Sequence, residues 1–353
     1  MTGARLSAKQ DECRDSLFAD TCVNCITKGR EQIVNKTFVM RTDEPGCDAE
    51  QTHRKVQSIE AAAKPDLPAY GGIPMERLGY YNGTYGPLEE MTVPMNDRAS
   101  WFGDGVYDAG PCRNYKIFAL DEHIDRLFRS AAALQIQMPV SKRELKDILQ
   151  TLVEKMDDGD LFVYYQVTRG TGLRKHVFTQ GNGNLWITLT PAKISDSREP
   201  IRLITTKDTR FFHCNIKTIN LIPSVMASQK AAEAGCSEAV FYRPGGRVTE
   251  CAHSNVHILK GDVLYTAPAD ELIRPGIARA HLLAACRELG IPFREEAFDL
   301  EALFDADEII VTSSSKLCLH ACEIDGAAAG MKDERHYEML RSYLVQEFMR
   351  ATE

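Results

Sequence analysis

A loop near the middle of the chain carries three side chains that could bind an anion. Arg169, Arg174 and His176 lie close together in the run VYYQVTRGTGLRKHVF at 163–178. A guanidinium and an imidazole two residues apart are well suited to holding a carboxylate. Alternating apolar residues before the loop predict a half-buried strand, and loops at strand ends often carry binding groups. A solvated surface turn is the alternative that these residues leave open.

A lysine and a glutamate further along the chain could supply covalent and electrostatic chemistry. Lys217 stands among isoleucines and leucines in NIKTINLI at 215–222. Removing its amine from water would lower the pKa of the amine and make it a nucleophile or base, as Schiff-base lysines require. Glu250 ends a predicted strand, where its carboxylate could face a protonated ring nitrogen such as that of pyridoxal phosphate. The alternative is a lysine that covers apolar surface with its stem and a glutamate that is simply exposed.

Three further segments could hold a phosphate. Arg126 lies off the apolar stripe of a predicted helix, so it is either solvated or directed toward an anion. A proline and a glycine precede a helix predicted to begin at Ile277, and the free N–H groups of a helix N-terminus bind anions. Residues 312–315 add four hydroxyl groups at the end of a predicted strand.

The apolar patterns predict the elements that must position these side chains. Helices are expected at 120–134, 141–156, 225–234, 277–289 and 335–349. Strands are expected at 162–168, 185–190, 201–205, 238–242, 247–250, 256–259, 263–265 and 308–312. Asp121 is expected to cap the first helix. Helices and strands do not alternate regularly, which favours an α+β fold over a parallel α/β fold.

The same patterns divide the chain into three parts. Residues 1–78 are polar and weakly periodic and are expected to form an N-terminal extension and linker. A small α+β domain is expected at 79–195 and a larger domain at 196–353.

Composition and charge limit the classes of partner. The chain has 353 residues, 44% of them hydrophobic, and a formal net charge of −8, values typical of a soluble globular protein. Nucleic acids and anionic membranes attract positive charge, so neither is expected as a partner. No segment approaches the roughly 20 apolar residues of a membrane helix, and the N-terminus lacks a signal-peptide pattern, so a cytoplasmic location is expected.

The cysteines predict neither disulfides nor a metal site. The 11 cysteines are scattered along the chain, a distribution typical of reduced thiols. Cys22 and Cys25 form a C-x-x-C, but no second closely spaced pair completes a zinc site. Cys318 and Cys322 lack further ligands at metal-site spacing, so we expect no metal.

The order of these segments resembles the class IV, or fold-type IV, pyridoxal-phosphate aminotransferases over about residues 80–326. The motifs that carry the resemblance are DRASWFGDGVYD (97–108), LDEHIDRLFRSAAALQI (120–136), CNIKTINLIPSVMASQKAAEAG (214–235), VTECAHSNVHIL (248–259), IRPGIARA (273–280) and ADEIIVTSSS (306–315). The resemblance implies a two-domain α+β fold like that of D-amino acid aminotransferase, with pyridoxal 5′-phosphate bound by the larger domain.

The resemblance also implies roles for individual residues. Lys217 is implied as the catalytic lysine, which binds the cofactor covalently and moves the proton, and Glu250 as the partner of the pyridine nitrogen. The other cofactor-binding residues that it implies are Arg126, Ser254, Ile277, Ala278, Ser313 and Ser314. The phosphate is expected to be held by Arg126, by Ser313 and Ser314, and by the backbone amides of Ile277 and Ala278.

Within the family, Arg174 and His176 resemble the D-amino acid aminotransferase branch. There the two residues and the tyrosine that matches Tyr107 hold the substrate carboxylate, and the loop comes from the neighbouring subunit. The resemblance therefore implies a homodimer that transaminates a D-amino acid such as D-alanine with a 2-oxo acid such as 2-oxoglutarate.

Other readings of the same residues stay open. An L-branched-chain aminotransferase or an aminodeoxychorismate lyase would use the same lysine and glutamate, although the Arg-x-His loop argues against both. The chain also departs from the family pattern at His253, at Ala278 and at 108–111, where the usual extended strand is not expected. The changes at His253 and Ala278, together with the long N-terminal extension, suggest an alternative of another class, a catalytically silent cofactor-binding or interaction protein. The intact Lys217, Glu250 and Arg126 argue against it.

Overall fold

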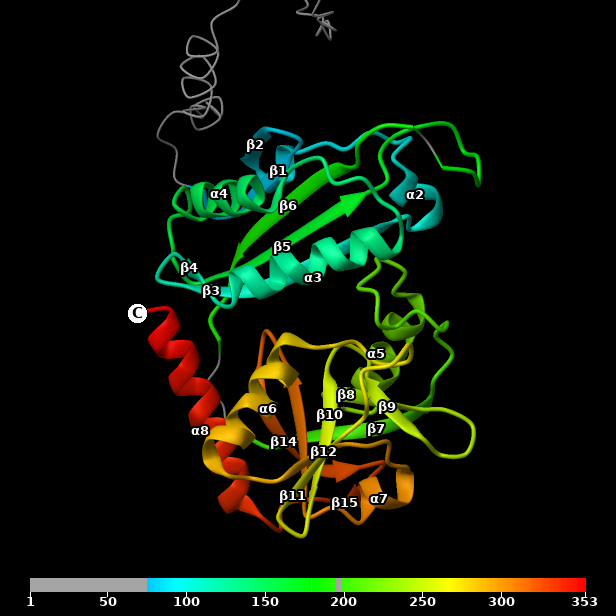
Figure 1. Ribbon diagram of the computed structural model, residues 1–353, viewed down its shortest axis with the longest axis vertical. Helices are drawn as coiled ribbons and strands as arrows, with labels where there is room; N and C mark the ends of the chain where they lie inside the picture. Colours follow the sequence, from blue (N-terminus) through cyan, green and yellow to red (C-terminus); the bar gives the residue numbers. More distant parts are fainter. Residues whose placement is uncertain (1–74, 179, 195–197) are drawn as a thin grey trace, which may run out of the picture. The chain divides into compact units, whose positions relative to one another are not determined.

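The computed structural model describes residues 75–178, 180–194 and 198–353 (Figure 1). The helices in these ranges are η1 (Leu88–Glu90, a 3-10 helix), α2 (Arg98–Phe102), α3 (Leu120–Ala133), α4 (Lys142–Val153), α5 (Ile222–Glu233), α6 (Ile277–Leu289), α7 (Leu300–Phe304) and α8 (Glu334–Ala351). Most of the predicted N-terminal extension, including Cys22 and Cys25, lies outside the described residues, and the domain boundaries at 78 and 195 stay a prediction.

The first of two sheets in the described ranges is fully antiparallel. Its six strands follow the order β2-β1-β6-β5-β3-β4. They are β1 (Leu78–Tyr81), β2 (Thr84–Pro87), β3 (Gly105–Arg113), β4 (Lys116–Ile117), β5 (Leu161–Thr168) and β6 (Asn184–Pro191). Helices α3 and α4 pack against this sheet (Figure 1), and Leu127, Leu149 and Val163 are fully buried in their shared core. The predicted amphipathic helices therefore form with their apolar faces inward.

The second sheet is mixed and has nine strands. Its order is β12-β11-β10-β13-β14-β7-β8-β9, with β15 paired to β14. The strands are β7 (Ile201–Lys207), β8 (Glu238–Tyr242), β9 (Val248–Cys251), β10 (Asn255–Lys260), β11 (Val263–Thr266), β12 (Phe293–Glu295), β13 (Glu308–Ser313), β14 (Leu317–Ile324) and β15 (Ala327–Ala328). Helices α6 and α8 share one buried core with β10 and β13, and α5 packs against β8. The two sheets and their helices make the predicted α+β fold.

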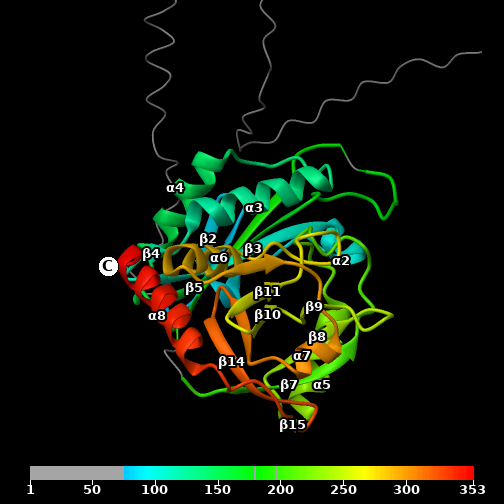
Figure 2. The same cartoon turned by 60° about the horizontal axis from the view of Figure 1, so that its bottom comes forward.

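Helix α3 of the first sheet approaches helix α6 of the second (Figure 2). Glu122 on α3 and His281 on α6 come within 3.2 Å of each other. An isolated bridge between Val106 and Thr218 adds a contact between β3 and the segment before α5. Lys217 directly precedes Thr218 in this segment. Of the helices in the described ranges, none has the length and apolarity that a membrane crossing requires.

Two local expectations are wrong. Asp121 does not cap α3, because the helix begins one residue earlier and its cap is Ala119, with φ +50°. Asp121 lies inside the first turn, where a carboxylate still suits the helix dipole, and binds Lys146 Nζ at 2.7 Å. Residues 108–111 do not interrupt the extended chain, because they pair in register with β5. The carbonyl of Pro111 accepts from the N–H of Phe118, so its missing N–H faces away from β5 and costs the β3–β5 pairing no bond.

Candidate active site

One pocket collects side chains from segments far apart in the sequence. Its wall comes from α3, the segment before α5, the β9–β10 turn, the start of α6 and the end of β13. The residues are Arg126, Lys217, Glu250–Asn255, Arg274, Gly276–Ala278 and Thr312–Ser314. All of the residues predicted to bind the cofactor lie in this wall.

Lys217 lines this pocket. The backbone of Lys217 is held by a bond from its N–H to Ser130 Oγ at 3.3 Å and by a bond from the Tyr107 N–H to its carbonyl at 2.9 Å. Its Nζ lies 4.0 Å from the centre of the Tyr107 ring. Burial, together with the charges of Arg274 and Arg126, holds the pKa of the Lys217 amine well below its ordinary value. The amine is therefore a better nucleophile and base at neutral pH than that of a solvated lysine.

Glu250 is a buried carboxylate held by three donors. Its oxygens accept from Arg210 Nη1, from Asn255 Nδ2 at 3.1 Å and from the backbone N–H of Arg274 at 3.0 Å. Arg210 also binds Asp208, whose carboxylate lies at 2.9 Å. The interpretation of Glu250 as a freely exposed hairpin end is wrong. Its partner Arg210 was not identified from the sequence, because the two are forty positions apart.

Arg126 is buried and faces the pocket instead of solvent. Its Nε and Nη2 each donate to one oxygen of Asp108 at 2.8 Å, and its Nη1 donates to the carbonyl of Pro275 at 3.3 Å. His123 Nδ1 lies 2.7 Å from the same carboxylate. Burial alone would raise the pKa of Asp108, but the charge and hydrogen bonds of Arg126, aided by His123, hold that pKa well below its usual range. The pair fixes the guanidinium in place at the pocket wall.

The start of α6 and the end of β13 offer donors for a phosphate. Gly276 is the N-cap of α6, and among the described residues no side chain caps the helix, so the first N–H groups are available to a ligand. A Cβ at Gly276 would lie 2.1 Å from Asn255 Oδ1, so this position requires glycine. Ser313 and Ser314 face the same space. Thr312 differs, because its hydroxyl lies 2.9 Å from Nε2 of the buried His257.

Ser254 and His253 share one buried carboxylate. The Ser254 hydroxyl donates to Glu238 Oε2 at 2.9 Å, and His253 Nδ1 lies 2.6 Å from the same oxygen. The hydrogen bond and charge of Glu238 raise the pKa of His253 despite partial burial. His253 therefore brings a titratable cation to the pocket wall.

The Arg-x-His loop lies elsewhere in the same chain. Arg174 and His176 are exposed and do not line the pocket; both lie against Phe102, with the Arg174 guanidinium 5.4 Å and the His176 ring 5.2 Å from its centre. Arg169 is buried and binds Asp104 at 2.9 Å, so this arginine holds the loop base. The substrate-binding role of the loop stays a prediction.

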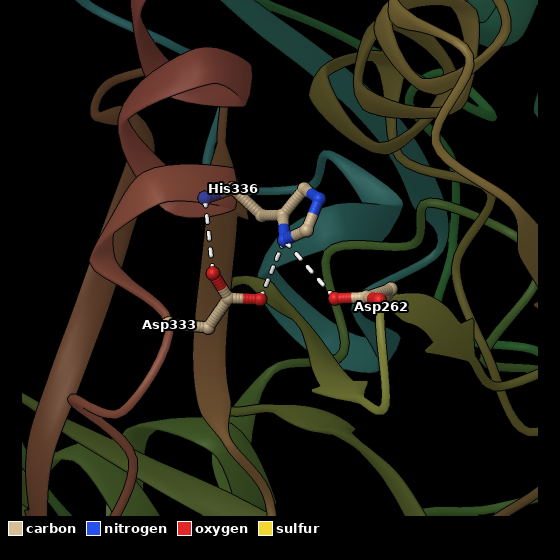
Figure 3. A group of neighbouring side chains, drawn as sticks. All are labelled: Asp262, Asp333 and His336. Atoms are coloured by element: carbon tan, nitrogen blue, oxygen red, sulfur yellow. Dashed lines mark hydrogen bonds and ion pairs between the residues drawn. The ribbon is translucent and has the colours of Figure 1, made fainter.

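A separate group of ligand-type side chains lies at the start of α8 (Figure 3). Nδ1 of His336 lies 2.5 Å from Asp333 Oδ2 and 3.8 Å from Asp262 Oδ1. Asp333 is the N-cap of α8 and accepts from the backbone N–H of His336 at 3.3 Å. Helix capping therefore accounts for the contact between Asp333 and His336. That the chain uses no metal stays a prediction.

Comparison with known proteins identifies the family. Residues 105–324 match the family model described as amino-transferase class IV. The chain belongs to the class IV aminotransferases. A D-alanine aminotransferase from Bacillus licheniformis is 38% identical to this aminotransferase over 71% of the present chain and 89% of its own. The D-alanine aminotransferase from Listeria monocytogenes serotype 4b (strain F2365) is also 38% identical, over 74% of the present chain and 93% of its own.

Solved structures confirm the fold-type IV architecture of this aminotransferase. The branched-chain amino acid aminotransferase from Escherichia coli aligns with a TM-score of 0.72 and 21% identity, covering 79% of this chain and 96% of that one. The branched-chain amino acid aminotransferase of T.th., solved with pyridoxamine 5′-phosphate, aligns with a TM-score of 0.71 and 22% identity over 79% of this chain and 96% of that one. The structural relatives of this aminotransferase thus include a protein that binds a pyridoxal-phosphate derivative.

The residues of the pocket fit such a group. The α6 N-terminus and two serine hydroxyls provide donors for a phosphate. Glu250 provides an acceptor for a protonated ring nitrogen, and Lys217 provides an amine for a carbonyl. The departure at Ala278 leaves the backbone amide in place, which is the group that a helix N-terminus offers to an anion.

Proposed function

We propose that this aminotransferase transfers the amino group of a D-amino acid such as D-alanine to a 2-oxo acid such as 2-oxoglutarate, with pyridoxal 5′-phosphate as its cofactor. The observation that carries the proposal is the position of the Lys217 amine, whose pKa is lowered, in one pocket with Glu250 and the N-terminus of α6. The activity named for relatives at 38% identity supports a D-amino acid as the donor.

The side chains divide the work of amino transfer. When bound, pyridoxal phosphate withdraws electrons from the α-carbon of the amino acid. Lys217 would hold the cofactor, and its amine would move the proton at the α-carbon of the substrate. Glu250 keeps a proton on the ring nitrogen, and its three donors hold its carboxylate in place.

Other residues of the pocket bind the phosphate of the cofactor. The amides of Ile277 and Ala278, with the hydroxyls of Ser313 and Ser314, bind the phosphate, since each faces the pocket. Arg126 adds a charge whose orientation is fixed by its two bonds to the Asp108 carboxylate.

Substrate recognition requires a homodimer in this proposal. The carboxylate of the substrate is held by Tyr107 together with Arg174 and His176 of the second copy, since the two loop residues lie outside the pocket of their own chain. Leu173 and Val177, which flank them, are 74% and 72% exposed. Burial of these apolar side chains against a second copy would stabilise the dimer.

The visible absorption of the purified protein tests the function, because the cofactor absorbs differently when it carries an aldehyde and when it carries an amine. We expect D-alanine to convert the spectrum, 2-oxoglutarate to restore it, and L-leucine to leave it unchanged. Conversion by L-leucine alone would favour a branched-chain aminotransferase. A bound cofactor that responds to neither amino acid would favour an aminodeoxychorismate lyase or a catalytically silent protein. Adding aminodeoxychorismate would distinguish these two, because only the lyase would convert it.

A further inference from the structure

Arg274 is a pocket residue whose side chain has no assigned partner. Its backbone is fixed at both ends, because its N–H donates to Glu250 Oε2 and its carbonyl accepts from Asn255 Nδ2, each at 3.0 Å. The side chain lines the pocket. Its Nε is buried and finds no hydrogen-bond partner within the described ranges. A buried donor without an acceptor is costly, so this atom points to a missing ligand.

Three other charged residues of the pocket already have ion partners. Arg126 pairs with Asp108 at 2.8 Å, Glu250 with Arg210, and His253 with Glu238 at 2.6 Å. In the described part of the chain, Lys217 and Arg274 are the pocket cations for which no ion pair forms. Lys217 loses its charge easily, because burial and the neighbouring cations Arg274 and Arg126 lower its pKa. Arg274 is therefore a permanent positive charge that, unlike Arg126, has no carboxylate partner among the described residues.

Arg274 lies in the chain segment that connects Glu250 with the N-terminus of α6. Residue 274 binds Glu250 through its N–H, and the next residue, Pro275, accepts from Arg126. Two positions later, α6 begins. The segment thus runs from the carboxylate that suits a ring nitrogen to the amides that suit a phosphate.

We propose that Arg274 binds an oxyanion of the ligand in this pocket, either the phosphate of the cofactor or a carboxylate of the substrate. The proposal rests on the proposed function for the identity of these ligands. A guanidinium donates two parallel hydrogen bonds to either group, so the chemistry of recognition is shared. Arg274 is in this respect a specificity-determining residue, because an arginine beside Lys217 favours anionic ligands over neutral amines and aldehydes.

Equilibrium binding to full-length protein tests the proposal. Arg274→Leu removes the charge and keeps an apolar stem, Arg274→Lys keeps the charge and loses the fork, and Arg294→Leu is the control, since Arg294 lies on β12 with its side chain 58% exposed. The probes are pyridoxal 5′-phosphate, pyridoxal without phosphate, and glutarate as a carboxylate. We expect Arg274→Leu to weaken the binding of at least one oxyanion probe by about tenfold or more, the scale of a charge-assisted hydrogen bond. The affinity of Arg274→Lys should lie between those of Arg274→Leu and the wild type.

The affinities of the three probes identify the partner of Arg274. Weaker binding of pyridoxal phosphate with unchanged binding of pyridoxal supports the phosphate as the partner. Weaker binding of glutarate to the cofactor-loaded variant, with unchanged cofactor affinity, supports the carboxylate. If all three probes bind Arg274→Leu as they bind the Arg294→Leu control, the proposal is overturned.

The proposed function can fail separately. If the wild-type protein binds no pyridoxal phosphate, the proposed function is wrong. The shift in melting temperature caused by inorganic phosphate or glutarate still reports anion binding in that case. A shift that disappears in Arg274→Leu but persists in the control supports the role of Arg274, and equal shifts in both overturn it.

Discussion

The backbone N–H of Tyr107 donates to the carbonyl of Lys217 at 2.9 Å. Strand β3 of the first sheet is thereby joined directly to the segment that carries the candidate catalytic lysine. The Tyr107 ring and the lysine amine then face each other at 4.0 Å. The substrate site is expected where these two residues meet. Tyr107 belongs to the first sheet, and Lys217 lies in the segment that leads into α5, a helix packed on the second sheet.

Mixing two inactive variants tests whether the Arg-x-His loop acts on a second copy. We expect Lys217→Ala and Arg174→Ala each to lose at least about 10²-fold in turnover, the scale of a positioned acid or base. Mixed dimers would hold one site with both the native lysine and the native loop, so activity should rise well above that of either variant. The transamination rate of the mixture, after a dissociation and reassociation step, measures this.

The control for the loop is Lys175→Ala, which removes an exposed neighbour of Arg174 and should keep full activity. If the loop served its own chain, the mixture would show only the average of its two components.

The buried Asp108–Arg126 pair should contribute to stability in a pH-dependent way. Asp108→Asn leaves the Arg126 charge without its partner, and we expect a loss of about 3 kcal/mol in the free energy of unfolding at neutral pH. The folded-state pKa of Asp108 is lowered, so its contribution is complete above the ordinary aspartate pKa of about 4 and declines as the pH falls below it.

Denaturant unfolding at neutral pH and near pH 3 checks both expectations. The difference between wild type and Asp108→Asn should shrink at the lower pH. The exposed Asp147→Asn on α4 is the control and should change little at either pH. An undiminished difference at low pH would contradict the assignment of the stability to charge pairing.

His253 should titrate above the ordinary histidine range because of Glu238. The two lie 2.6 Å apart, and the pKa of His253 is raised. Its protonated form therefore stabilises the fold fully below about pH 6.5, and this contribution is lost as the pH rises through the higher folded-state pKa. Glu238→Gln should lower the pKa of His253.

The NMR chemical shift of the His253 ring, followed against pH in wild type and Glu238→Gln, measures this change. The exposed His213, which does not line the pocket, serves as the reference signal. Equal His253 titration curves in the two proteins would show that Glu238 does not hold the imidazole.

Gly276→Ala should disturb the pocket through Asn255. The new methyl group would lie 2.1 Å from Asn255 Oδ1, so the amide must move and give up its bond to Glu250. We expect a loss of about 1–3 kcal/mol in stability, typical of overpacking, and weaker cofactor binding.

A double-mutant cycle with Asn255→Ala provides the check. If the clash is with the amide, Gly276→Ala should cost clearly less in the Asn255→Ala background. Strictly additive losses would place the strain elsewhere.

Sequence patterns predicted the elements with regular periodicity. Helix α6 (Ile277–Leu289) and strand β8 (Glu238–Tyr242) form with the predicted bounds, because capping glycines and runs of β-forming residues define their ends. Strand β3 was not predicted throughout, since it contains glycine, aspartate and proline, which are depleted in strands. Strand β14 was missed because its buried residues do not alternate regularly.

The residues of the candidate site were predicted from the sequence, but the ion pairs that they form were not. The motifs named Lys217, Glu250 and Arg126, and the structure brings them into one pocket. Their ion partners Asp108 and Arg210 could not be found from local patterns, because these pairs join segments that meet only after folding. The role inferred for Arg274 depends on which neighbouring charges already form ion pairs, and these pairs can be identified only in the folded structure.

The pocket wall draws on both sheets, since Arg126 belongs to a helix packed on the first and Glu250 to a strand of the second. A ligand bound there is lost when either sheet unfolds, so its binding energy penalises partial opening as much as complete unfolding. Saturating ligand should therefore merge the melting of the two halves into one cooperative transition, and hydrogen exchange in β3 and β10 should slow together.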